Sequence, residues 1–165
     1  MVDEAAFREL MGAVCAPVTV VTTTTGEGRP HGTTVSSFAS LSLRPPMVSF
    51  ALDTGSALLS HVRESRRVGV NVLAHGQESV ATAFAGRGEA KFAGFSWRDD
   101  DGLPRLTGAG GWLVGTVTQL VSGGDHVLVL AEVMASEVAD APPLVYARRT
   151  FGTHSRLGER AEPLS

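Results

Sequence analysis

Four short stretches of the sequence carry side chains that can bind or transform a small molecule. Thr34-Val35-Ser36-Ser37 supplies three hydroxyl groups to an extended segment. Asp53-Thr54-Gly55-Ser56 has the composition of a turn before a helix, where free backbone amides attract anions. Lys91 is the only lysine of the chain, and His126 follows a Gly-Asp turn. Each stretch also has a structural alternative: a polar strand face, a capping turn, a solvated cation and a turn histidine.

The composition argues against several classes of protein. A length of 165 residues with 43% hydrophobic and 19% charged side chains is that of one globular domain. The net charge of −3 and the lack of a basic face argue against a nucleic-acid partner. Cys15 is the only cysteine, which excludes an intramolecular disulfide and favours a reducing compartment. There is no signal-like start and no apolar run of roughly 20 residues, so we expect a soluble cytoplasmic protein with no membrane partner.

Hydrophobic periodicity predicts short strands separated mainly by turns. The expected strands cover residues 18–24, 32–43, 47–53, 67–73, 112–121, 126–138 and 144–146. Short helices are expected after Asp3, after Gly55 and over residues 77–85, and residues 93–108 have the composition of a loop. Because turns outnumber helical crossovers, the pattern predicts a mainly β fold: a small, mostly antiparallel β-barrel with a few short helices. We expect one domain over residues 1–154 and a flexible tail over residues 155–165.

The predicted helices carry recognisable ends and faces. In the first, Asp3 is the expected N-cap, and the apolar side chains that follow fall on one face: Phe7, Leu10, Met11 and Val14. Thr54 or Ser56 is the expected N-cap of the second helix.

Several common enzyme signatures are missing from the chain. There is no phosphate-binding loop of the G-x-x-x-x-G-K-[ST] type and no G-x-S-x-G elbow, and Gly108-Ala109-Gly110-Gly111 fails the dinucleotide-binding pattern. The five histidines, at positions 31, 61, 75, 126 and 154, show no metal-ligand spacing, so we expect a site without a metal.

Many short motifs follow one another in a specific order along the chain. The first run is Gly32-x-Thr34-Val35-Ser36-Ser37-Phe38-x-Ser40-x-Ser42-x-x-Pro45-Pro46. It is followed by Gly69-Val70-Asn71-Val72-Leu73, Phe84-Ala85, Lys91-Phe92, Gly124-Asp125-His126 and Pro143-Leu144-Val145-Tyr146-x-x-Arg149-x-Phe151. In this order the motifs resemble the flavin reductase family with the FMN-binding split barrel, whose members are the reductase components of two-component flavin-dependent monooxygenases. The resemblance covers roughly residues 7 to 152 and rests on the order and spacing of the pieces.

The resemblance implies a function and an assembly. The expected fold is a split barrel over residues 1–154, paired as a homodimer with sites near the interface. The expected reaction passes hydride from NADH or NADPH to FMN or FAD, and the reduced flavin reaches a separate monooxygenase component by diffusion. Such a reaction needs mainly that two cofactor rings be positioned, so the missing motifs do not argue against an enzyme. The alternatives are an enzyme with tightly held FMN that reduces another acceptor, and a non-enzymatic FMN-binding module.

The resemblance also implies roles for individual residues. His126 is expected at the nicotinamide side of the flavin as the catalytic residue, and Asp125 either fixes its tautomer or caps the turn. Lys91 is expected beside the flavin phosphate. For Asn71, a structural hydrogen bond to a neighbouring loop is the alternative to a flavin contact. The expected cofactor-binding residues are Thr34, Val35, Ser36, Ser37, Asp53, Thr54, Ser56, Asn71, Val72, Leu73, Phe84, Ala85, Lys91, Phe92, Tyr146 and Arg149.

Overall fold

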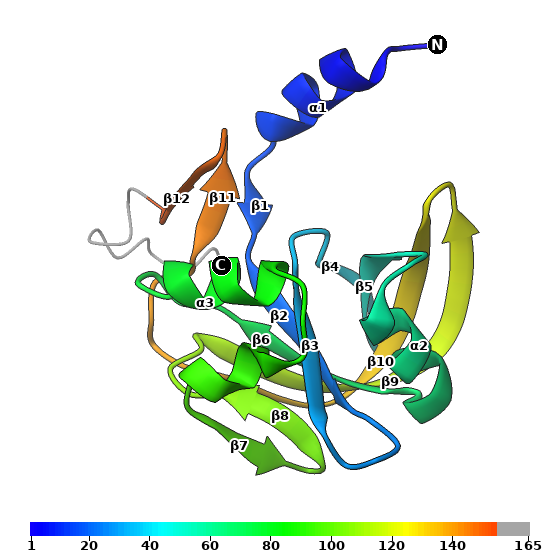
Figure 1. The fold of residues 1–165 in the computed structure, drawn as a ribbon, viewed down its shortest axis with the longest axis vertical. Coiled ribbons are helices and arrows are strands. Elements are labelled where there is room, and N and C mark those ends of the chain that lie inside the picture. Colours follow the sequence, from blue (N-terminus) through cyan, green and yellow to red (C-terminus); the bar gives the residue numbers. More distant parts are fainter. Residues whose placement is uncertain (155–165) are drawn as a thin grey trace.

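Antiparallel strands are the main elements of the structure, a computed structural model that describes residues 1–154 (Figure 1). The helices are α1 (Glu4–Gly12), α2 (Ala57–Ser65), α3 (Glu78–Ala85) and a short 3-10 helix, η1 (Ala90–Gly94). The first strands are β1 (Ala16–Pro17), β2 (Thr19–Thr24), β3 (Pro30–Val35), β4 (Ala39–Leu43), β5 (Pro46–Asp53) and β6 (Arg67–Val72). The remaining strands are β7 (Trp97–Asp100), β8 (Leu103–Leu106), β9 (Gly111–Gly123), β10 (His126–Val138), β11 (Val145–Ala147) and β12 (Thr150–Gly152). The mainly β class is confirmed, whereas the tail expected over residues 155–165 lies outside the described residues.

The largest sheet has seven strands in the order β3-β2-β6-β9-β10-β5-β4, and neighbouring strands are antiparallel throughout. Of two smaller sheets, one contains β1, β11 and β12, and the other contains β7 and β8. The mostly antiparallel arrangement expected from the sequence is confirmed. Among residues 1–154, the strand pairs leave β3 and β4 as the edges of the large sheet, so they do not close a barrel.

Two clusters of buried apolar side chains place α2 and α3 on opposite faces of β2. Val20 and Val21 are adjacent in β2, so their side chains point to opposite faces. Val21 belongs to the cluster that contains Leu58 of α2, whereas Val20 belongs to the cluster that contains Phe84 of α3. Both helices also contact β3, the edge strand beside β2. The edge strand β3 is therefore flanked by α2 and α3, which lie on opposite faces of the sheet.

The stretch from 93 to 108 is not a loop, contrary to the expectation from its composition. It contains η1 and a hairpin formed by β7 and β8. The acidic residues that suggested a loop make the turn: Asp99 Oδ1 accepts a hydrogen bond of 3.0 Å from the Gly102 amide. Asp101 and Gly102 both adopt positive φ, 55° and 78°, which closes the turn tightly. The apolar face of β8 is buried, which holds the hairpin against the large sheet.

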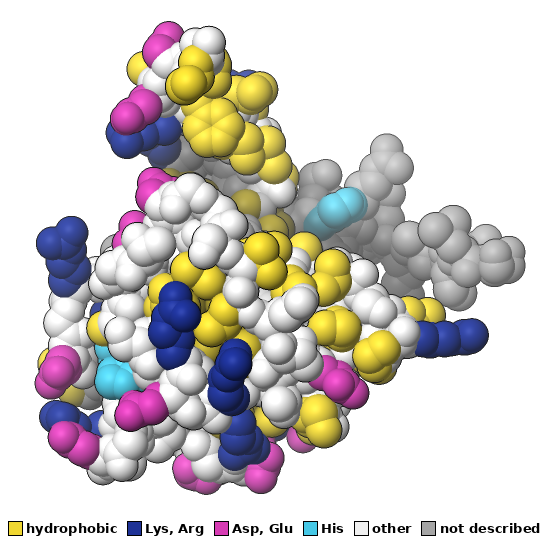
Figure 2. Space-filling model, turned by 90° about the vertical axis from the view of Figure 1, so that its right-hand side faces the viewer, with side chains coloured by type: hydrophobic (Ala, Val, Ile, Leu, Met, Phe, Trp, Pro, Cys, Tyr) yellow, Lys and Arg dark blue, Asp and Glu magenta, His cyan; other side chains and the backbone are white. Residues whose placement is uncertain are grey.

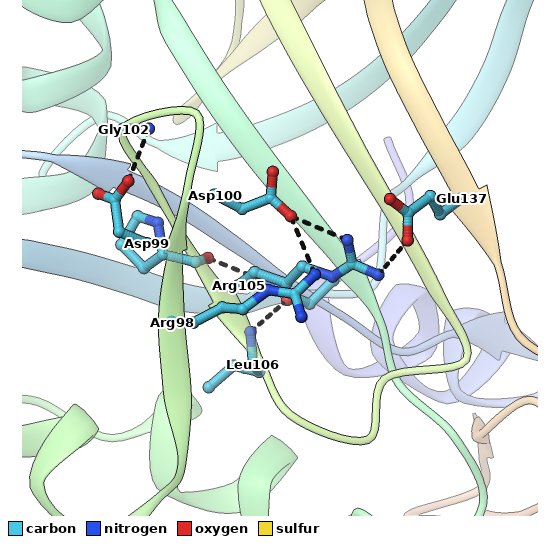
Figure 3. A network of polar contacts seen from close by, with 9 residues as sticks. Arg98, Asp99, Asp100, Gly102, Arg105, Leu106 and Glu137 are labelled. Carbon is cyan, nitrogen blue, oxygen red and sulfur yellow. Dashed lines mark hydrogen bonds and ion pairs between the residues drawn. The ribbon is translucent and has the colours of Figure 1, made fainter.

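A charged network ties this hairpin to β10 (Figure 3). The Arg105 guanidinium donates to Asp100 Oδ2 at 2.9 Å and to Glu137 Oε2 at 2.6 Å. It also lies 5.6 Å from the centre of the Trp112 ring, a cation–π contact. The hydrogen bond from Arg105 is the main reason that the pKa of Asp100 is lowered. The Arg105 side chain is therefore occupied by structural contacts with Asp100, Glu137 and Trp112.

The strand expected over residues 32–43 is two strands, β3 and β4, joined by residues 36–38. After Val35 the chain no longer pairs with β2. From Ala39 it pairs with β5, next to the opposite edge of the sheet. Ser37 bridges the gap, because its hydroxyl accepts a 2.9 Å hydrogen bond from the Ala51 amide. The hydroxyl-rich stretch therefore crosses from one edge of the sheet to the other.

α1 forms where the sequence predicts it, but it buries none of its side chains in this chain. Asp3 caps it as expected, accepting a 2.9 Å hydrogen bond from the Ala6 amide. The helix projects from the body, and apolar side chains gather on it (Figures 1 and 2). Phe7 is 53% exposed and Leu10 is 65% exposed, which is unusual for the apolar face of an amphipathic helix.

Candidate functional site

A hollow of about 890 Å³ lies between β3, the end of β5, α2 and the loop after α3. Its volume is in the range of small-molecule sites, roughly 300–1,000 Å³. The hollow brings together nine of the residues singled out in the sequence. They are Thr34, Val35, Ser36, Ser37, Asp53, Ser56, Ala85, Lys91 and His126.

The edge strand β3 provides one wall of the hollow. Only one side of β3 is paired, with β2, so its other side carries backbone N–H and C=O groups without a strand partner. The Thr34 hydroxyl donates to the Ala81 carbonyl at 2.6 Å, which fixes α3 against β3. Ser36 and Ser37 follow at the exposed end of the strand. The wall therefore offers neutral donors and acceptors rather than charge.

The start of α2 forms a second wall. Asp53 Oδ1 accepts from the Gly55 amide at 2.7 Å, so the carboxylate is used within the turn. Ser56 occupies the N-cap position, as one of the two sequence alternatives predicted, but its hydroxyl makes no capping bond. The hollow is lined there by Gly55, Ser56 and Ala57. The amides of Gly55 and Ser56 are bonded to Asp53, so the free amides and partial positive charge of the helix start begin at Ala57.

His126 and Asp125 lie at the same end as Asp53. His126 pairs with Asp53 across the β5–β10 ladder, and the Thr54 amide donates to the Asp125 carbonyl at 3.0 Å. His126 Nδ1 lies 2.7 Å from Asp125 Oδ1. This hydrogen bond lowers the pKa of Asp125, so the carboxylate is ionised and Nδ1 carries the proton. In the neutral ring, Nε2 is then an acceptor.

A cationic group lies at the other end of β3. Lys91 Nζ donates to the Phe84 carbonyl at 2.9 Å and to the Gly32 carbonyl at 3.2 Å, which leaves one N–H of the ammonium. Burial lowers the pKa of Lys91. His31 and His61 meet edge to face nearby, with ring centroids 5.0 Å apart. Burial, and then the charges of His61 and Lys91, lower the pKa of His31, against a raising effect of Glu89.

Eight of the residues singled out in the sequence do not line this hollow, and the clearest case is Asn71. Its side chain is fully buried. Its Nδ2 donates to the Val20 carbonyl at 3.2 Å and to the Pro104 carbonyl at 3.5 Å, and its Oδ1 accepts from the Leu106 amide at 2.8 Å. Asn71 therefore joins β2 and β6 to β8, which is the structural alternative, and both N–H groups of its amide are used within the fold.

The other seven residues are used in packing or turns. Leu73, Phe84 and Phe92 are buried in the core, with the two Phe rings 4.8 Å apart. Val72 pairs with Thr19 and Gly111 inside the sheet. Thr54 belongs to the turn described above. Tyr146 packs on Phe151 beside the turn that contains Arg149, in the separate three-stranded sheet. We leave all eight out of the proposed site.

Sequence reasoning missed His31, His61 and the loop from Gly86 to Glu89, which all line the hollow. His61 had a usable signal, because it lies one helical turn after Ala57 at the start of the same helix. Within the described part of the chain, no three His, Cys, Asp or Glu side chains are grouped to hold a metal ion. None of the helices in residues 1–154 has the length and apolar character needed to cross a bilayer.

Comparisons with family models and with curated proteins agree on the family to which this chain is similar. Residues 11–155 match the family model described as a flavin reductase like domain. The chain is 35% identical over 150 residues to the reductase component of 4-nitrophenol 4-monooxygenase/4-nitrocatechol 2-monooxygenase from Rhodococcus opacus, covering 91% of this chain and 80% of that protein. It is 36% identical over 151 residues to the NADH:riboflavin 5'-phosphate oxidoreductase of Streptomyces pristinaespiralis, covering 89% and 86% respectively. A Rhizobium meliloti relative is 34% identical over 158 residues, and the chain spans about half (51%) of its length.

Solved structures of similar fold include the NADH:FAD oxidoreductase SgcE6 of Streptomyces globisporus in complex with NAD and FAD fragments. The two structures superimpose with a TM-score of 0.89 at 28% sequence identity, covering 97% of this chain and 96% of that one.

Proposed function

This chain belongs to the flavin reductase like domain family, and we propose that it is an NAD(P)H-dependent flavin reductase acting on FMN or FAD. The observation that carries this proposal is that one hollow gathers nine sequence-predicted residues from β3 and the segment after it, β5, the N-cap of α2, α3, η1 and β10. Bound reduced nicotinamide supplies a hydride in this chemistry, and bound flavin accepts it. The task of the chain is therefore to position two ligands.

The walls of the hollow fit a flavin chemically. The unpaired edge of β3 and the hydroxyls of Ser36 and Ser37 match the alternating donors and acceptors of a flavin ring. The remaining N–H of Lys91 suits a phosphate group. We propose that these groups hold the flavin by neutral contacts along its ring and by charge at its phosphate.

His126 is the proposed contact to the nicotinamide. Asp125 holds the imidazole with Nδ1 protonated, so Nε2 can accept a hydrogen bond from the nicotinamide carboxamide. Such a contact orients the ring and lowers the barrier by positioning, without any proton transfer in the hydride step. We therefore assign His126 the catalytic role and Asp125 a positioning role.

We further propose a homodimer with the split-barrel arrangement of the family. The exposed apolar side chains of α1 need a cover that residues 1–154 of one chain do not supply, and a second copy would provide it. Light scattering should give twice the mass of one chain.

We propose that the reduced flavin diffuses from this protein to a separate monooxygenase. We also propose that the protein is located in the cytoplasm, because the free thiol of Cys15 fits a reducing compartment.

The proposal is tested by assaying the purified protein with all four pairs of NADH or NADPH and FMN or FAD. We expect NAD(P)H oxidation that depends on added flavin and is unchanged by a chelator. Flavin that washes out on dilution supports transfer to a partner, whereas flavin that stays bound while another acceptor is reduced supports the rival enzyme. A protein that binds flavin without oxidising NADH or NADPH would contradict the proposal.

A further inference from the structure

A second hollow of about 560 Å³ adjoins the first at its cationic end. The two share His31, His61 and Glu89 in their linings, so they form one continuous trough. The second hollow lies beyond the start of β3, next to the turn after β2 that contains Gly26. A flavin mononucleotide with its phosphate at Lys91 would end at the shared residues and leave this second space unfilled.

The charge along the trough changes in a regular order. The end near Ser37 offers neutral hydroxyls and backbone groups, together with Asp53, whose carboxylate is bonded to the Gly55 amide. The middle carries Lys91 with the His31–His61 pair. The far end carries two acids, Glu27 and Glu64, and a third, Glu89, lies at the boundary that the two hollows share. Arg29, the one arginine in the second lining, is paired with Glu27 and lies 3.6 Å from Glu89.

Acids at the far end select the kind of group that can bind there. Carboxylates accept hydrogen bonds from ribose hydroxyls and from an exocyclic amine, as an acidic residue does for the ribose of NAD in other folds. They repel a phosphate, which is better placed beside the cationic middle. In FAD the flavin ring is followed by the pyrophosphate and then by the adenosine. The neutral, cationic and acidic parts of the trough follow one another in the order that suits these three groups.

We propose that the second hollow binds the adenosine half of FAD and that the chain therefore takes FAD in preference to FMN. This inference rests on the proposed function, since it uses the flavin site of the first hollow. In the proposed complex, the His31–His61 pair and Lys91 contact the pyrophosphate, and the Glu64 carboxylate on α2 accepts a hydrogen bond from the adenosine. Glu64 and His61 are three residues apart on one helix, which puts them on the same side.

The test compares equilibrium binding of FAD, FMN and riboflavin by flavin fluorescence in the wild-type protein and two variants. Gly26→Trp adds a large side chain to the turn that lines the second hollow, and no atom lies within 4 Å of a Cβ built at Gly26. Glu64→Ala removes the acceptor. Gly94→Trp is the matched control, because Gly94 is equally open and lines neither hollow.

We expect the wild-type protein to bind FAD about 10-fold more tightly than FMN, and both variants to remove most of that difference. FMN and riboflavin affinities should stay within about twofold of wild type in every variant. Equal wild-type affinities for FAD and FMN, or a loss shared by both flavins in Gly26→Trp, would overturn the inference and leave the proposed reductase intact. If a parallel titration of the same variants with NADH showed a loss of NADH affinity alone, the inference would be overturned and the hollow would be assigned to the nicotinamide dinucleotide instead. Failure of all three flavins to bind the wild-type protein would contradict the reductase itself.

Discussion

Nδ1 of His126 lies 2.7 Å from Oδ1 of Asp125, so adjacent residues at the β9–β10 turn form an oriented imidazole–carboxylate pair. The strand register places this pair directly opposite Asp53, where β5 ends and the turn to α2 begins. His126 is therefore fixed from two directions at one end of the hollow.

Replacing His126 by alanine should slow the use of NAD(P)H without releasing the flavin. Loss of a positioning contact removes one to a few kcal/mol of transition-state stabilisation, so kcat/KM for NAD(P)H should fall about 10-fold or more. Steady-state kinetics and flavin titration measure the two effects separately. A folded His126→Ala protein with wild-type kinetics would show that His126 is only a turn residue.

Asp125→Asn is the companion variant to His126→Ala. It keeps the size of the side chain but no longer fixes Nδ1 as the protonated nitrogen. A positioning role predicts a smaller fall in kcat/KM for NAD(P)H than in His126→Ala, because the imidazole stays in place but its tautomer is no longer fixed.

Lys91→Met should weaken binding of phosphorylated flavins, since the variant removes the ammonium and keeps a long apolar side chain. We expect the Kd of FMN to rise about 10-fold, the effect of losing one charge-assisted contact. Riboflavin, which lacks the phosphate, is the matched ligand and should bind both proteins alike. Equal weakening for riboflavin would mean that the bonds from Lys91 to Gly32 and Phe84 shape the hollow and that the phosphate lies elsewhere.

FAD binding should strengthen as the pH falls, because His31 is neutral in the free protein. Burial and the charges of His61 and Lys91 hold its pKa below the ordinary imidazole value, while Glu89 opposes them. A bound pyrophosphate raises that pKa, so binding takes up a proton. Affinity then rises as pH falls through the bound-state pKa and levels off below the free-state pKa.

The pH effect on FAD binding is measured by titrations at a series of pH values. His31→Asn should flatten the curve, and riboflavin should show no slope in either protein. A pH dependence that persists in His31→Asn would assign the effect to another group.

Gly69→Ala should destabilise the fold. A Cβ at Gly69 would lie 2.7 Å from Thr22 Oγ1 and overlap the buried Trp112 ring. Overpacking of this kind costs about 1–3 kcal/mol of the free energy of unfolding, measured by denaturant titration. Gly26→Ala is the control, because nothing lies within 4 Å of its Cβ, and it should change stability by about 0.5 kcal/mol or less. A stable Gly69→Ala protein would show that the Trp112 ring can move aside.

Local patterns in the sequence predicted most strands, α2 and α3, because each has a clear apolar period. They failed at residues 93–108, where the acids of a tight hairpin turn have the composition of a loop. They also joined β3 to β4, since the crossing at Ser37 depends on a contact with Ala51 that no local pattern contains.

The place of candidate site residues in the hollow was predictable where family motifs coincide with its walls, as at Ser36, Ser37 and His126, whose roles stay predictions. Asn71 shows the limit of that approach, because a polar residue in a motif can be needed for the fold alone. His31 and His61 were missed because they are brought together only by the packing of α2 against β3.

The central claim, hydride transfer from NAD(P)H to flavin on this chain, is tested most directly by an anaerobic single-turnover experiment. The protein with bound flavin is mixed with NADH or NADPH, and with the same nucleotide deuterated at the transferred position, while flavin absorbance is followed. We predict loss of the oxidised flavin spectrum with one nucleotide oxidised per flavin, more slowly for the deuterated nucleotide. A flavin that stays oxidised on the folded wild-type protein with both nucleotides would contradict the account.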